Sequence, residues 1–536
     1  MIVKYLTDRG ITLSYHTLGF ILFFALFLLI FFVMQANIIR RGVILVGNLV
    51  FYYWMGGRGA LVVVIATSLI VYAGAALMGS VYLQFERSSS GLTNREKKAH
   101  LGKYRTRARV FLILTLVLLF GILVYIKAGR LLHFPQVESV SDLRMGKILV
   151  PLGISYYTFS CAGYLLDIYW RKTTAEWNYF NLLLGITFFP AIVEGPICNY
   201  RKLFRQLKEL PGADYTRVCF GMQRMIWGFF KKLVIADRLA VYSGAVFADP
   251  GSYAGVEIVL GGVANALALY ADFSGCMDIV IGASECMGIT LEENFRQPFF
   301  AETAAEFWRR WHITLGGWFK DYVYMPMIMR PSAMKRASEI RKKRGAHASQ
   351  VAQSTFPLLI VWLLTGLWHG TGPDYVVWGL YWGFLIVLGM IAEPFFTKLE
   401  AFFGIPVQTS GWRFVRRLRT FFLFVIGRML TATGSLEGFA LVIRRLFSSN
   451  RLWVLFDESL YTHGLDRKDF YVALLGLLIL FVVDLLHEKN MKIRGTIAAQ
   501  PLVLRWCVYL GAILFILVFG IYGITYDASN FAYAAF

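Results

Sequence analysis

Long runs of apolar residues recur along the chain and constrain its fold more than any other feature. Four of the longest cover residues 18–36, 110–126, 470–486 and 502–522. Each approaches or exceeds the length that a helix needs to cross a hydrocarbon core about 30 Å thick. Only 16% of the residues are charged, whereas a soluble protein carries about 25%. The sequence therefore predicts an all-α, polytopic protein of the plasma membrane.

The apolar runs give roughly eleven to thirteen candidate spans, and we expect about eleven transmembrane helices because the runs at 43–55 and 180–194 are short. Their approximate positions are 18–36, 43–55, 60–84, 110–127, 148–169, 180–194, 218–236, 256–284, 357–393, 420–446, 469–487 and 502–524. The run at 357–393 is long enough for two helices. No repeat of about 20–50 residues and no low-complexity linker divides the chain. We therefore expect a single integral membrane domain over residues 1–536.

The positive charge of the chain gathers beside the apolar runs. The formal net charge is +21. Residues 86–109 hold eight Lys or Arg against two Glu, and residues 330–344 hold seven against one. Cytoplasmic loops of membrane proteins have this bias. The distribution favours a positive-inside topology and contact with anionic membrane lipid over binding of nucleic acid.

Residues 295–329 mix charged residues with aromatic ones, unlike the apolar runs. Such a charge density cannot face lipid at depth. We therefore expect an interfacial segment, or a re-entrant segment that lines a central cavity. If this segment is helical, Phe307, Trp311 and Leu315 fall on one face and His312 lies among aromatic residues beside it.

Two histidines are candidates for chemistry within the membrane. His369 ends an apolar run that begins at Leu358, and Gly370 and Pro373 interrupt the predicted helix just after it. A neutral imidazole there could take the proton of an attacking hydroxyl and pass it to a leaving thiolate. A histidine satisfied by a backbone carbonyl at a helix end fits the spacing equally well. On residue type alone, His312 is better explained as a packing or hydrogen-bonding residue.

Asp272 and Asp278 lie within the apolar run at 256–284. Carboxylates in such a run face a cavity or pair with arginine, and pairing with Arg309 or Arg310 is as plausible as a direct role. The sequence contains no His-Glu-x-x-His, no Asp-rich calcium loop and no Gly-x-Ser-x-Gly. It therefore predicts neither a metal site nor a serine-hydrolase elbow.

Seven motifs follow one another over about residues 150–385. They are Gly-Pro-Ile-Cys-Asn-Tyr-Arg at 195–201, Gly-Phe-Phe-Lys-Lys-Leu-Val-Ile-Ala-Asp at 228–237, Asp-Phe-Ser-Gly at 272–275, Glu-Asn-Phe-Arg-Gln-Pro at 293–298, Phe-Trp-Arg-Arg-Trp-His at 307–312, Trp-Phe-Lys-Asp-Tyr at 318–322 and Gly-Leu-Trp-His-Gly at 366–370. In this order they resemble the membrane-bound O-acyltransferases, and among them the bacterial branch of alginate O-acetylation and lipoteichoic-acid D-alanylation.

The resemblance implies a ring of helices around a central tunnel, with a catalytic core at residues 150–385. It implies that His369 is the essential histidine and that His312 is a second histidine close to the reaction. The residues expected to line the substrate tunnel are Trp311, Trp368, Arg309, Arg310, Asn294, Asp272 and Asp278. In this scheme His369 deprotonates the acceptor hydroxyl, while His312 and Trp311 orient it and steady the developing oxyanion.

The resemblance also implies the substrates. An acyl thioester, either acetyl-CoA or an acyl carrier protein, would enter from the cytoplasm as a co-substrate, with no bound cofactor. The acceptor would be a hydroxyl of an extracytoplasmic polysaccharide or of a partner acyltransferase, and acetyl is the leading acyl group. One alternative is D-alanyl transfer to teichoic acid, in which the basic residues 330–344 dock an acidic carrier protein. A polysaccharide or lipid transporter is another, because a wet cavity with buried charges would serve it too.

Overall fold

The structure is a computed structural model that describes residues 14–131, 136–137, 148–149, 153–370 and 372–522. Within these residues the regular structure is helical, apart from a parallel pairing of β1 (Gln136–Val137) with β2 (Ile148–Leu149) and one isolated bridge. The all-α class predicted from the apolar runs is confirmed.

Seven helices of the described chain are long and apolar enough to cross a membrane. They are α3 (Asn37–Ser88), α4 (Asn94–Leu131), α11 (Val256–Cys286), α15 (Pro331–His369), α16 (Pro373–Phe402), α19 (Arg467–Glu488) and α21 (Leu502–Phe519). A shorter apolar helix, α2 (Leu18–Val33), precedes them. The multi-pass membrane class is confirmed, and the expected number of about eleven spans stays a prediction.

Some of the expected spans differ from the helices for local reasons. The runs at 43–55 and 60–84 both belong to α3, which bends at Gly57, where φ is 72°. The run at 180–194 is broken before Pro190, because proline cannot donate the backbone hydrogen bond that a helix interior needs. The length of an apolar run therefore does not distinguish one bent helix from two spans, or a short buried helix from a crossing one.

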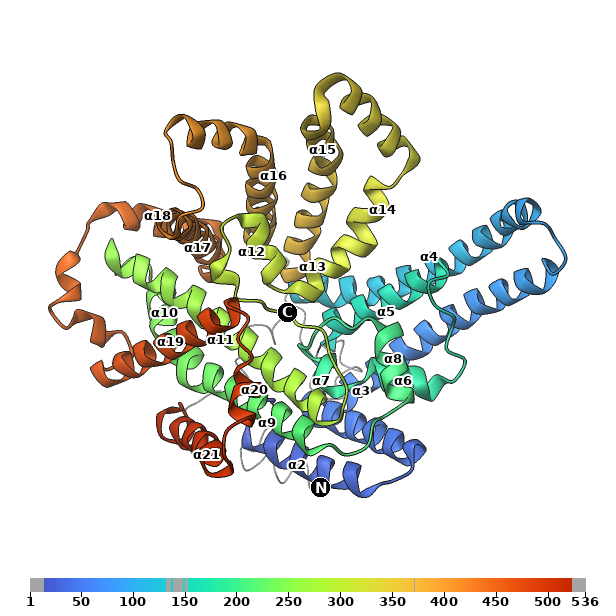
Figure 1. The fold of residues 1–536 in the computed structure, drawn as a ribbon, viewed down its shortest axis with the longest axis horizontal. Coiled ribbons are helices and arrows are strands. Elements are labelled where there is room, and N and C mark those ends of the chain that lie inside the picture. The colour runs from blue at the N-terminus through green and yellow to red at the C-terminus, as the bar shows by residue number, and fades with distance from the viewer. Residues whose placement is uncertain (1–13, 132–135, 138–147, 150–152, 371, 523–536) are drawn as a thin grey trace. The chain divides into compact units, whose positions relative to one another are not determined.

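The described chain divides into two compact units, of which the first holds residues 14–222 and 280–292. After α4, its helices are α5 (Ile154–Tyr169), α6 (Tyr179–Ile186), α7 (Phe189–Ile192) and α8 (Tyr200–Lys208). In this unit α3 packs along α4, α3 also contacts α5, α6 and α7, and α4 contacts α5. Figure 1 shows α3 and α4 as long neighbouring helices. The expected single domain over residues 1–536, with its core at 150–385, stays a prediction.

The second unit holds residues 223–279 and nearly all of the described chain after residue 292. Besides α15, α16, α19 and α21, its longer elements are the end of α9 (Tyr215–Phe229), the π-helix η2 (Phe230–Ala236), α10 (Asp237–Ala248), α17 (Ser410–Ala432), α18 (Leu436–Ser448) and α20 (Ile493–Ala498). η2 packs against α19 and α21, and α16 packs against both α15 and α17. A π-helix is rare and is frequent at functional sites.

Residues 293–329 form several short pieces instead of one helix. The pieces are η3 (Pro298–Phe300), α12 (Ala304–Arg310), α13 (Ile313–Phe319), η4 (Lys320–Tyr324) and α14 (Met325–Ile328). A continuous helix with Phe307, Trp311 and Leu315 on one face is therefore the wrong description, because the helix stops just before Trp311 and restarts after His312. All three side chains are nevertheless buried. Whether this segment re-enters the bilayer stays a prediction.

Candidate active site

The chain turns sharply at His312, between α12 and α13. Just before the turn, Trp311 forms an isolated antiparallel bridge with Phe295, and just after it the N–H of Ile313 donates to the carbonyl oxygen of Asn294 at 3.0 Å. His312 itself has φ 46° and ψ 52°, a left-handed conformation that is uncommon outside glycine. Such backbone strain costs about 1–3 kcal/mol and is concentrated at functional positions.

A side-chain amide holds the imidazole of His312 in place. The Oδ1 atom of Asn294 lies 3.1 Å from Nδ1 of His312, and it accepts hydrogen bonds from the backbone N–H of Thr314 at 3.1 Å and from its hydroxyl at 2.9 Å. The backbone N–H can only donate, so the oxygen of the amide must face this cluster. Nδ1 of His312 therefore carries the proton and donates it to Asn294. The lone pair of the neutral ring is on Nε2.

His312 is neutral at ordinary pH. Its side chain is buried, with 2% of its surface exposed. Burial lowers the pKa of His312 to about 3, because the charged form would lose its hydration. The rings of Phe273 and Trp368 lie beside the imidazole, with centroids at 4.9 Å and 5.8 Å. The environment thus keeps a neutral imidazole between aromatic rings.

His369 lies at the end of α15, as the sequence predicted. It is the last residue of the helix, and Gly370 caps it by donating its N–H to the carbonyl of Gly366 at 3.1 Å. Its ring is buried between Trp368, at 4.7 Å, and Trp378 of α16, at 5.0 Å. Because Trp368 also contacts His312, one indole ring lies beside both histidines.

Asp272 pairs with a buried lysine of the π-helix. Nζ of Lys232 lies 2.8 Å from Asp272 and 3.0 Å from Asp237, and the lysine side chain is 2% exposed. Removing one partner of such a buried pair costs about 3–5 kcal/mol, because it leaves a charge without compensation. This group therefore joins η2 firmly to α11.

Asp278 pairs with two further cations of the same region. It lies 2.8 Å from Arg224 and 2.6 Å from Lys231. Arg224 also contacts both carboxylate oxygens of Glu293; these acids raise the pKa of Arg224 against the effect of burial, which lowers it. Lys231 donates to the hydroxyl of Ser274 at 2.8 Å. The cations of this network come from α9 and η2.

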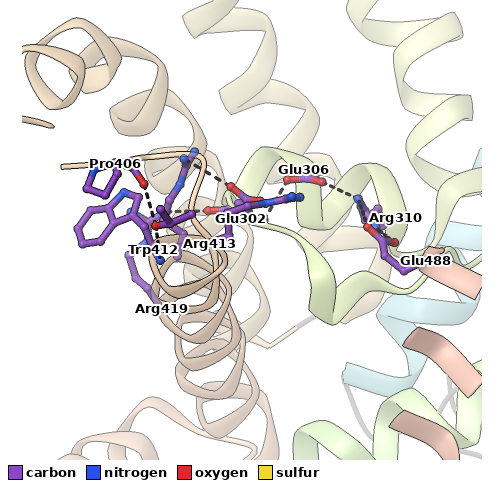
Figure 2. Close-up of polar contacts among 10 residues, drawn as sticks. Glu302, Glu306, Arg310, Pro406, Trp412, Arg413, Arg419 and Glu488 are labelled. Atoms are coloured by element: carbon purple, nitrogen blue, oxygen red, sulfur yellow. Dashed lines mark hydrogen bonds and ion pairs between the residues drawn. The ribbon is translucent and has the colours of Figure 1, made fainter. Parts of the chain in front are cut away.

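The pairing considered from the sequence, of Asp272 or Asp278 with Arg309 or Arg310, is therefore wrong. Arg309 is exposed, and Arg310 pairs with Glu488 of α19 and with Glu306 (Figure 2). The cations that pair with Asp272 and Asp278 lie 40 or more residues before them in the sequence. Adjacent lysines within an apolar run were the signal that could have indicated a buried acidic partner.

A cavity of about 720 Å³ adjoins this region within the second unit. Asn294, Lys231 and Ser274 contribute polar groups to its wall, while Val508, Ala512 and Phe515 of α21 contribute apolar ones. Its volume and mixed lining are typical of small-molecule sites. Asn294 lines the cavity and also binds His312, so the cavity approaches the histidine through this amide. The positions of His369, Trp311 and Arg309 in a substrate tunnel stay predictions.

Residues 137–340 match the family model of MBOAT, the membrane-bound O-acyltransferase family. The matched residues include Asn294, His312 and both aspartates, and they end before His369. In the part of the chain that the structure describes, no group of three or more His, Cys, Asp or Glu side chains could hold a metal ion.

Curated relatives with three different functions are similar to this chain. A probable alginate O-acetylase of Pseudomonas syringae pv. tomato is 31% identical over 54% of this chain and 50% of the relative. A peptidoglycan O-acetyltransferase of Helicobacter pylori is 29% identical over 53% and 56%. A teichoic acid D-alanyltransferase of Bacillus subtilis is 30% identical over 46% and 60%. The alignments thus span about half the length of the relatives.

Proposed function

We propose that the protein moves an acyl group from a cytoplasmic thioester to a hydroxyl outside the membrane, because residues 137–340 match the family model of the membrane-bound O-acyltransferases. Acetyl is the leading acyl group, and the acceptor is an extracytoplasmic polysaccharide or an intermediate partner protein. The observation that carries the proposal is the buried, neutral His312, whose tautomer Asn294 sets, together with Trp368, whose ring contacts both His312 and His369.

The reaction needs one base. We assign this role to His369, which removes the proton of the acceptor hydroxyl as its oxygen attacks the thioester carbonyl. The new C–O bond forms, the C–S bond breaks, and the thiolate takes the proton from His369. His369 is neutral before and after the reaction, so the proton transfers need no second acid or base.

The tautomer of His312 favours one of the two roles that the family resemblance implies. A lone pair on Nε2 can accept a hydrogen bond from a hydroxyl but cannot donate one to an oxyanion. The reacting hydroxyl gives its single proton to His369, so His312 orients the acceptor by accepting a hydrogen bond from a neighbouring hydroxyl of the polymer, and the rigid turn that holds the ring makes this orientation reproducible. The developing oxyanion needs other donors.

The names of the relatives support a polymeric acceptor. Alginate, peptidoglycan and teichoic acid are three different polymers, and two of the three relatives are named for transfer of an acetyl group. Acetyl transfer to a polysaccharide hydroxyl is accordingly the main proposal for this chain.

D-alanyl transfer from a carrier protein is the second candidate, since one relative is a D-alanyltransferase. The first turns of α15 favour it, because Lys335, Arg336, Lys342 and Lys343 are exposed there and could dock an acidic carrier. Replacing these four with Glu should slow carrier-dependent transfer and leave transfer from acetyl-CoA unchanged. Equal rates with the carrier before and after the replacement would exclude docking at this helix.

The experiment that tests the main proposal follows radiolabelled acetyl-CoA with the purified protein in nanodiscs. It compares the wild type with His369→Ala and with His347→Ala, a matched control that removes another histidine of α15. Thioester consumption should be lost in the first variant only. Equal turnover in both would contradict the assignment. Turnover that requires a charged carrier protein would favour the second candidate, and polymer movement without thioester consumption would indicate a transporter.

A further inference from the structure

Four arginines occupy the first turns of α17. Arg413, Arg416 and Arg417 are spaced to share one side of the helix, and Arg419 follows in the next turn. Like charges this close repel one another unless anions compensate them. The carboxylates near these arginines therefore show whether their positive charge is compensated.

Glu302 is the main acidic partner of this cluster. Its carboxylate lies 2.6 Å from Nε of Arg413 and 3.4 Å from Arg416, and its backbone oxygen accepts from Arg419 at 2.7 Å. Figure 2 shows Arg413 and Arg419 of α17 next to Glu302. Glu400 is also close, and it accepts a hydrogen bond from Trp412 at 3.1 Å. Among the described residues, Glu302 is thus the carboxylate that forms ion pairs with these arginines, while Glu306, Glu400 and Glu488 act on Arg413 or Arg419 at longer range.

Arg417 and Arg419 keep unmatched charge in the described part of the chain. Neither makes an ion pair there. Arg417 lies over the ring of Phe300 at 5.2 Å, and its buried Nε has no hydrogen-bond partner among the described residues. Burial and the charge of Arg416 lower the pKa of Arg419. Guanidinium groups in this state are suited to binding phosphate, which can take two hydrogen bonds from one fork.

The cluster also lies at the right depth for phosphate. The apolar part of α17 begins at Phe421, and a rise of about 1.5 Å per residue places the arginines within about 12 Å of it. Phe414 and Leu418 are exposed between the arginines, as expected for a helix that meets lipid. The basic residues put this end of α17 on the cytoplasmic side. Both lipid headgroups and soluble phosphates reach that level.

We propose that Arg416, Arg417 and Arg419 bind the phosphate group of a ligand at the cytoplasmic edge of the membrane. The ligand is either an anionic lipid, bound by its headgroup, or the coenzyme A part of the donor. Glu302 competes with this phosphate for Arg416. Glu302 precedes α12 and the turn at His312. A ligand bound at the arginines would therefore alter the contacts of the segment that leads to this histidine.

Two binding measurements on the full-length protein separate these sources, and neither requires turnover. Native mass spectrometry counts phosphatidylglycerol retained from mixed phosphatidylglycerol and phosphatidylcholine nanodiscs. Equilibrium binding of radiolabelled coenzyme A is measured in phosphatidylcholine nanodiscs. The double variant Arg417→Gln with Arg419→Gln should weaken binding of at least one ligand about tenfold, the value of a charge-assisted hydrogen bond. Arg444→Gln, an exposed arginine of α18, is the control for lost charge.

The identity of the weakened ligand tells the source. Loss of phosphatidylglycerol alone assigns a lipid site, loss of coenzyme A alone assigns a donor site, and loss of both assigns a shared phosphate site. Glu302→Gln should bind the same ligand more tightly than the wild type, a gain that misfolding cannot produce. The proposal is overturned if the double variant binds both ligands like the wild type, or if the wild type binds neither.

Discussion

The surroundings of the two histidines differ in what holds the ring. At His312, a strained turn and the amide of Asn294 set both the position and the tautomer of the imidazole. At His369, a helix end and the rings of Trp368 and Trp378 enclose the imidazole. A fixed tautomer suits a group that orients a hydroxyl, whereas a base must carry a proton in one step and release it in the next.

The largest effect should come from replacing His369 with glutamine. Gln fills much of the space between the two indole rings but cannot serve as a base. Transfer should fall by about 10²–10⁴-fold, the usual contribution of general base catalysis, while the thermal unfolding temperature changes little. Rates of thioester consumption at saturating donor measure the effect. Near-wild-type turnover would mean that His369 acts by packing, and the contrast between the two histidines would then disappear.

A smaller loss should follow from His312→Asn. Asparagine tolerates the left-handed backbone, so this variant removes the imidazole without adding strain. We expect transfer to fall about 10²-fold, mostly as a higher KM for the acceptor, because an orienting hydrogen bond is lost. His312→Ala serves as the comparison, since this variant loses the ring and is also destabilised by the positive φ at this position. If only the Ala variant is impaired, His312 is structural.

How far the sequence predicts this site depends on how local each signal is. Gly370 and Pro373 stand next to His369, so the helix end could be predicted without any tertiary structure. The partner of His312 is Asn294, 18 residues away across a β-bridge. No periodicity in the sequence indicates that turn, and the continuous helix considered as one possibility there does not form.

The same limit applies to the charged groups and to the helices. A buried aspartate in an apolar run predicts a cation partner, but Arg224 lies 54 residues from Asp278. The identity of the cation depends on how η2 packs against α11, which sequence spacing does not show. Apolar run length correctly predicted the helical membrane class, but it gave wrong helix bounds where Gly57, Pro190 or the break between α17 and α18 changed the course of the chain.

Asn294 offers a way to alter the tautomer while His312 stays in place. Asn294→Leu removes the acceptor and leaves the N–H of Thr314 unsatisfied, which should cost about 1–3 kcal/mol of stability and slow transfer about tenfold. Asn294→Asp keeps the acceptor oxygen, but its negative charge should raise the pKa of His312. Its activity should then fall on acidification at a higher pH than in the wild type. Identical pH profiles would show that Asn294 does not tune this ring.

The smallest effect concerns the stability of the wild type against pH. His312 has a pKa of about 3 in the native state and about 6.5 in the unfolded chain. Above pH 6.5 both states hold a neutral ring, so there is no contribution. As the pH falls from 6.5 towards 3, only the unfolded state binds a proton, and the native state loses stability.

This loss should amount to about 2 kcal/mol between pH 7 and pH 5. His312→Asn should lack it, so the unfolding midpoint of the variant should fall less on acidification than that of the wild type. Thermal unfolding in one detergent at both pH values measures the difference. Equal pH sensitivity would mean that His312 is hydrated or charged in the native state. An imidazolium has no free lone pair, so the role of His312 as a hydrogen-bond acceptor would be excluded together with its contrast to His369.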